Sequence, residues 1–114
     1  AGKNIVDNVV AKRDEKTVVR TQTGQAYANW VQANGYQNDL HAAATGYERI
    51  ARGILQGQDV NTFAREDQQL AQSLAQYRNS FEQMGISQQN IAKDMEKTLQ
   101  KMQDLQRNNG GGTP

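Results

Sequence analysis

The 114-residue chain has no cysteine, one histidine and no apolar run of the roughly twenty residues needed to cross a bilayer. Without cysteine, disulfides and thiolate metal sites are excluded, although this does not fix the compartment. A net charge of +1 predicts no strong attraction to nucleic acid or anionic lipid. Only one Trp, four Tyr and two Phe are present and 36% of the chain is hydrophobic, so we expect one small domain with a thin core.

What the chain does contain is apolar spacing typical of helices. From residue 63, apolar residues recur at alternating steps of four and three, which is the spacing of a coiled-coil seam rather than of a strand. A second stretch from residue 91 has the same helical spacing. We therefore predict an all-α fold, a helical bundle of three to five helices that ends in a C-terminal antiparallel helical hairpin. The predicted hairpin seam consists of Phe63, Leu70, Leu74, Tyr77, Phe81, Met84, Ile91, Met95, Leu99, Met102 and Leu105.

The segment between the two arms of this hairpin carries the signals of a tight turn. Gly85 suits the left-handed residue that ends many helices, because it has no Cβ atom. Ser87 is a suitable N-cap for the next helix, since its hydroxyl can accept a free backbone N–H. Ile86 lies between them and can contact Phe81 on one side and Ile91 on the other, as in a hydrophobic staple. We therefore expect the arms to fold back antiparallel at residues 85–87.

The rest of the chain is also predicted to be helical. Apolar residues between positions 5 and 10 fit one helical stripe, but the β-branched run 17–21 leaves open whether residues 3–34 form one helix or two. Asp39 is expected to cap a third helix, and Asp59 or Asn61 to start a fourth.

A single α-helical domain is predicted for residues 1–107, followed by a flexible Gly-rich tail at 108–114. The pattern leaves open whether the N-terminal third is ordered alone, extended, or ordered by a partner. It also leaves the localisation open, because a virion, the bacterial cytoplasm and the periplasm are all compatible with this composition.

Two groups of small residues are candidate contacts between subunits. Glycine inside a helix costs about 1 kcal/mol relative to alanine. The interior glycines of the third helix therefore indicate either close approach by another helix or a loose helix that orders in an assembly. An alanine stripe on the fourth helix can face either the chain's own core or another subunit. The candidate oligomer contacts are Ala64, Ala71, Ala75, Ala42, Gly46 and Gly53.

No arrangement of acids, bases or nucleophiles predicts catalysis, so we expect no catalytic, cofactor-binding or metal-ligating residues and no cofactor. His41 follows a predicted N-cap and is interpreted as an ordinary surface histidine. The repeated Glu-x-x-His motifs of a carboxylate di-metal bundle do not occur. Asp67 occupies a polar position within the seam. We interpret it as a residue that fixes helix register at some cost in stability, over simple exposure near the helix start.

A line of basic residues on the last predicted helix offers a different function. The candidate phosphate contacts are three lysines at four-residue steps, Lys93, Lys97 and Lys101. Asp104 shares their side of the helix, so the stripe is not purely basic. A solvated face opposite the seam is therefore the favoured interpretation.

Long Gln-rich helices, a thin core and the lack of a catalytic arrangement favour a subunit that gains apolar burial from partners. Our leading hypothesis is a non-enzymatic structural or assembly subunit of a larger macromolecular complex, acting through helix–helix packing. A phage virion component or a part of a secretion or conjugation machine is the setting expected from composition. The expected partners are proteins, either copies in a homo-oligomer or members of a multi-protein assembly. The alternative is a small nucleic-acid-associated accessory protein that uses its basic helix faces, with binding that falls steeply with salt.

Overall fold

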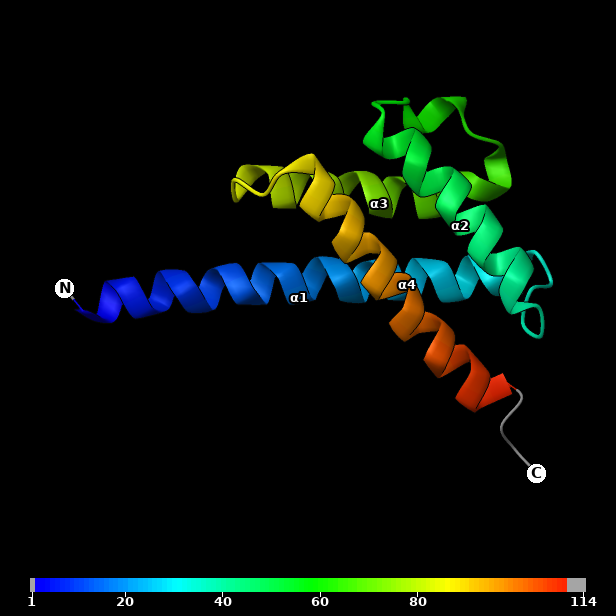
Figure 1. The fold of residues 1–114 in the computed structure, drawn as a ribbon, viewed down its shortest axis with the longest axis horizontal. Helices are drawn as coiled ribbons and strands as arrows, with labels where there is room; N and C mark the ends of the chain where they lie inside the picture. Colours follow the sequence, from blue (N-terminus) through cyan, green and yellow to red (C-terminus); the bar gives the residue numbers. More distant parts are fainter. Residues whose placement is uncertain (1, 111–114) are drawn as a thin grey trace.

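The computed structural model describes residues 2–110, and the side chains of residues 15–108, as an all-helical chain (Figure 1). The elements within this part of the chain are α1 (Gly2–Ala33), α2 (Leu40–Leu55), the 3-10 turn η1 (Val60–Thr62), α3 (Arg65–Gln83) and α4 (Gln88–Gly110). The predicted all-α bundle is confirmed. Among the described residues, no helix is both long and apolar enough to cross a membrane. The predicted tail starts too early, because α4 continues through 108–110; residues 111–114 lie outside the described part.

The N-terminal third is one helix, which settles the question left open by the β-branched run. Val19 and Thr23 are buried where α1 packs along α3, so tertiary packing outweighs the weak helix propensity of these residues. The helix ends at the predicted place. Gly35 has a φ of 74°, and the Tyr36 N–H donates to the Val31 carbonyl at 2.8 Å, which closes the last turn.

The predicted N-cap of the third helix, which is α2, is confirmed, but the predicted start of the fourth helix, which is α3, is wrong. The Asp39 carboxylate accepts the Ala42 N–H at 3.0 Å at the start of α2. Asp59 instead caps the short turn η1, where it accepts the Asn61 N–H at 2.9 Å. Phe63 follows η1 in extended conformation, and α3 begins only at Arg65. The Asp59 carboxylate reaches only the N–H groups of the turn that directly follows it. α3 therefore begins without a side-chain cap.

The turn between α3 and α4 has the predicted geometry. Gly85 has a φ of 81°. The Ile86 N–H donates to the Phe81 carbonyl at 3.1 Å, which is the longer hydrogen bond of a Schellman motif. The Ser87 hydroxyl accepts the Asn90 N–H at 3.3 Å and so caps α4. The residues of this turn therefore end one helix and begin the next as expected.

The closely packed antiparallel arms predicted beyond this turn are not confirmed. α3 runs alongside α1, whereas α4 crosses over α1 and moves away from α3 (Figure 1). Most of the predicted seam is still buried, but against several helices rather than one: Phe63, Leu70, Leu74, Tyr77, Phe81, Ile91, Met95, Leu99 and Met102. Met84 is half-buried. Leu105 is 62% exposed, on the part of α4 that has moved away from α3.

Glutamine side chains attach α4 to the backbone of the rest of the fold. The Gln103 amide donates to the Leu40 carbonyl at 2.7 Å. The Gln106 amide donates to the Tyr36 carbonyl at 2.7 Å and to the Gln37 carbonyl at 3.1 Å. Gln88 donates in the same way to the Leu55 carbonyl. These amides attach α4 to backbone carbonyls of the α1–α2 connection and of the two ends of α2.

Candidate functional site

Three of the candidate oligomer contacts face the interior of the chain itself. Ala71 is completely buried, and Gly46 and Gly53 are also buried. A Cβ atom on Gly46 would stand 2.6 Å from the Trp30 ring, so this glycine makes room for a side chain from α1 of the same chain. These three residues are therefore core contacts rather than subunit contacts. Of the others, Ala64 is exposed and Ala42 and Ala75 are half-buried.

Asp67 is a buried carboxylate that joins three helices. The Trp30 indole N–H donates to its Oδ1 at 2.9 Å, and the Arg49 guanidinium donates to its Oδ2 at 3.0 Å. A buried charge is tolerated only when it is hydrogen-bonded and paired, and both conditions are met here. Asp67 thus links α1 and α2 to α3, and its role in the register of the seam between α3 and α4 stays a prediction.

A second polar cluster, which the sequence did not reveal, lies between α1, α3 and α4. Arg20 donates two hydrogen bonds to Asp94, at 2.9 and 3.0 Å. The Tyr77 hydroxyl hydrogen-bonds Asp94 and lies 2.8 Å from the Thr98 hydroxyl. Burial alone would raise the pKa of Asp94, but the hydrogen bonds from Arg20 and Tyr77 outweigh it and lower the pKa.

This cluster is a structural tie rather than a site for proton transfer. Burial, followed by the hydrogen bond with Asp94, raises the pKa of Tyr77 far above its ordinary value. Near neutral pH the phenol therefore stays protonated and the carboxylate stays ionised. A general acid or base works best with a pKa near the operating pH, and neither group meets that condition.

A pair of carboxyl groups faces across α2 and α4. Burial, followed by interaction with the Glu48 carboxyl group, raises the pKa of Glu96 above its ordinary value of 4.5. The folded state thus favours protonated Glu96. Its contribution to stability is present below the ordinary pKa and is lost as the pH rises through the raised value.

We expect Glu96→Gln to stabilise the fold at pH 7, because the amide is neutral and removes the repulsion from Glu48. The advantage should shrink as the pH falls towards 4, where Glu96 in the parent protein becomes protonated. Urea denaturation of both proteins at several pH values measures this difference. Glu15→Gln, at an exposed position of α1, serves as the control. A constant advantage of Glu96→Gln across the pH range would contradict the prediction.

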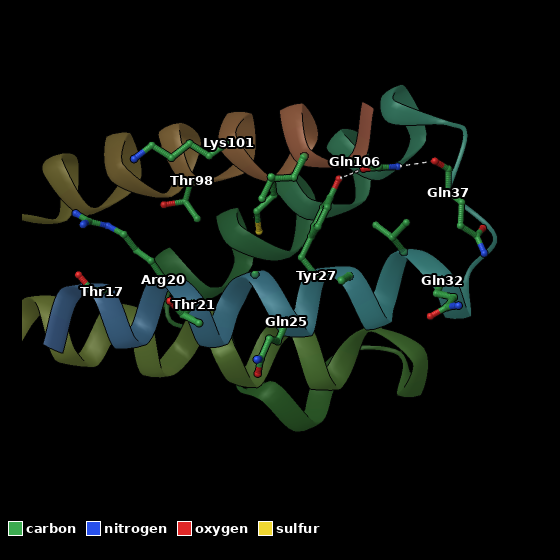
Figure 2. Close-up of a pocket in the computed structure, with 15 residues that line it drawn as sticks. Thr17, Arg20, Thr21, Gln25, Tyr27, Gln32, Gln37, Thr98, Lys101 and Gln106 are labelled. Carbon is green, nitrogen blue, oxygen red and sulfur yellow. Dashed lines mark hydrogen bonds between the residues drawn. The ribbon is translucent and has the colours of Figure 1, made fainter. Parts of the chain in front are cut away.

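A concave feature lies between α1 and the C-terminal half of α4, and we call it the α1/α4 groove. Its volume is ≈ 990 Å³. The wall from α1 runs from Thr17 to Gln32, and that from α4 runs from Thr98 to Gln106 (Figure 2). The apolar lining residues are Gly24, Tyr27, Ala28, Val31, Met102 and Leu105. This surface combines a buried floor with the exposed side chain of Leu105.

The two ends of the groove differ in chemistry. At one end the Tyr27 hydroxyl donates to Gln106 Oε1 at 2.7 Å, and Gln106 in turn bonds the Gln37 carbonyl, so side chains close that end (Figure 2). At the other end lie Arg20 and Lys101, the only charged residues in the described lining of the groove. The groove is therefore apolar along its floor, neutral at one end and basic at the other.

The groove was not predicted from the sequence, although the spacing of residues on α1 indicates part of it. Thr17, Gly24 and Val31 stand at steps of seven on α1 and so share one side of the helix. That alignment is visible only if residues 3–34 form a single helix, which the sequence left undecided. Leu105 was assigned to the apolar seam, whereas the structure places it in the groove lining.

The remaining sequence candidates are at the surface. Lys93, Lys97 and Lys101 are all exposed on α4, and of these Lys101 lines the groove. Their contact with phosphate stays a prediction. His41 is exposed on α2. Among the described residues, no cluster of three or more His, Asp or Glu side chains could hold a metal ion.

Comparisons with protein-family models, with curated proteins and with solved structures find no match to this chain. Its function is therefore inferred from the geometry of its own residues.

Proposed function

We propose that this protein is a non-enzymatic structural or assembly subunit that joins a larger complex by helix–helix packing in the α1/α4 groove. The observation that carries the proposal is the groove itself, with Leu105 62% exposed beside an apolar floor. Large apolar side chains that gather in a concave surface mark interaction sites, because their burial by a partner is favourable. A phage virion component or a part of a secretion or conjugation machine remains the setting that the Gln-rich, thinly packed helices suggest.

The polar clusters of the chain support the same proposal. Asp67 and Asp94 both use their carboxylates to tie helices together. Of the two, Asp94 joins α4 to α1, which are the two walls of the groove. A rigid scaffold that presents an exposed leucine beside a concave surface suits a subunit that recognises a partner by shape.

The test is photo-crosslinking from the groove in the cells that naturally make the protein. A benzophenone amino acid replaces Leu105, and in a matched control it replaces Lys93, which is exposed on the same helix but outside the groove lining. We expect a discrete light-dependent product of higher mass from position 105 and none from position 93. Absence of any product at position 105, with the protein present and folded, would overturn the proposal.

A further inference from the structure

We infer that the α1/α4 groove receives an amphipathic helix of a partner protein, with carboxylates on the part of that helix that covers Lys101. This inference rests on the proposed function and names the chemistry of the partner. It follows from the length of the groove, from the place of one glycine on its floor and from the distribution of charge along it.

The length and the walls of the groove fit a helix. The side chains of Tyr27 and Gln106 close one end, so the open part of the α1 wall runs from Thr17 to Tyr27. It spans about 15 Å along the helix axis, which is the length of a helical segment of about ten residues. Both walls are themselves helices, so a third helix can lay its apolar face between them, as in other helix-in-groove complexes. A partner helix of about three turns therefore matches the open part of the groove.

Among the residues whose side chains are described, none occupies the place of the side chain that Gly24 lacks. Glycine in a helix interior costs about 1 kcal/mol relative to alanine. At Gly46 the Trp30 ring occupies the place of the missing side chain, but a Cβ on Gly24 would meet only the Met102 sulfur, at an ordinary 3.9 Å. Gly24 lies in the groove lining, where the missing side chain leaves room for a partner's backbone to approach.

The charges in the groove select the partner and its direction. The only charged lining residues, Arg20 and Lys101, are basic and lie at the same end. Arg20 already donates two hydrogen bonds to Asp94, whereas the exposed Lys101 is placed to meet a charge on the partner. Acidic side chains and the negative C-terminal end of a helix are both favoured there. The opposite end, closed by Tyr27 and Gln106, offers amides and backbone carbonyls.

Two designed 18-residue helical peptides test this inference on the full chain. They share one Leu/Ala face and differ only in the residues at one end of that face, which are Glu in the first and Lys in the second. Fluorescence anisotropy at low salt measures the binding of each. We expect the acidic peptide to bind about 5- to 10-fold more tightly, since exposed ion pairs contribute modestly. Lys101→Glu should reverse the preference, and Lys93→Glu, outside the groove, should leave it unchanged.

Two further variants locate the binding. Gly24→Leu should fill the groove and abolish binding while circular dichroism shows an unchanged helical fold, because the nearest described atom to the new Cβ is Met102 Sδ at an ordinary 3.9 Å. Leu105→Asp should have the same effect. Equal affinity for the two peptides, or binding that survives Gly24→Leu, would overturn the inference.

Sedimentation of the free chain adds an independent outcome. A dimer that Leu105→Asp dissociates would show that the groove receives a second copy, which would also overturn the inference. If both peptides fail to bind but crosslinking from position 105 succeeds, the chemistry assigned to the partner is wrong and the assembly role stands. If both experiments fail, the assembly role falls as well.

Discussion

Replacing Trp30 with alanine is expected to lower the free energy of unfolding by about 3–5 kcal/mol, the usual cost of removing a buried Trp. Its side chain is only 3% exposed and packs against Tyr36, with ring centroids 5.3 Å apart, and against Gly46. The substitution also removes the indole N–H that Asp67 accepts, so a buried carboxylate loses one of its donors. Urea denaturation followed by far-ultraviolet circular dichroism measures the change.

The variant Trp30→Phe separates the two contributions and folds more readily. It keeps much of the ring volume and removes the hydrogen bond to Asp67, so its loss of stability should be smaller than that of Trp30→Ala. If Trp30→Ala is unfolded at 25 °C, Trp30→Phe still gives a measurable transition. A loss below about 1 kcal/mol for Trp30→Ala would show that this ring is not central to the core.

Gly46→Ala is expected to destabilise the protein by about 1–3 kcal/mol, even though alanine is the better helix former. The new Cβ would stand 2.6 Å from two atoms of the Trp30 ring. That ring cannot retreat easily, because the hydrogen bond to Asp67 and the contact with Tyr36 hold it from two sides. Steric conflict therefore outweighs the gain in helix propensity.

The matched control is Gly24→Ala, in a helix interior where the new Cβ meets only Met102 at 3.9 Å. At this position the higher helix propensity of alanine is not opposed by a steric conflict, so the free energy of unfolding should rise by up to about 1 kcal/mol. Thermal denaturation of the two variants beside the parent protein measures both changes in stability, a loss for Gly46→Ala and a gain for Gly24→Ala. Stabilisation by both substitutions would mean that α1 and α2 are less closely packed than the structure shows.

The local signals in the sequence predicted local structure well. Gly35, Asp39, Gly85 and Ser87 end or begin helices at the expected places, because a positive φ or a free N–H needs only the residue itself and its near neighbours. The failure at Asp59 has the same origin. Its carboxylate does cap a turn, but sequence could not tell a 3-10 turn from the start of a long helix.

The sequence did not predict which helices pack against each other. The apolar spacing on α3 and α4 showed which side of each helix is buried, but not that α3 would pack along α1. Two helices with apolar stripes can meet at several crossing angles. The divergence of α4, the exposure of Leu105 and the groove itself depend on that choice. Arg20 and Asp94 are 74 residues apart, and no sequence pattern linked them.

The attachment of α4 through glutamine amides differs from its attachment through the Arg20–Asp94 ion pair, because the amides carry no charge. Gln103 and Gln106 hold this helix to backbone carbonyls with neutral groups that neither titrate nor respond to ionic strength. Acidification or added salt should therefore weaken the Arg20–Asp94 ion pair and the proposed contact of Lys101 with an acidic partner, whereas the glutamine contacts persist. The C-terminal half of α4 should then stay attached to the α1–α2 connection under conditions in which the proposed partner dissociates.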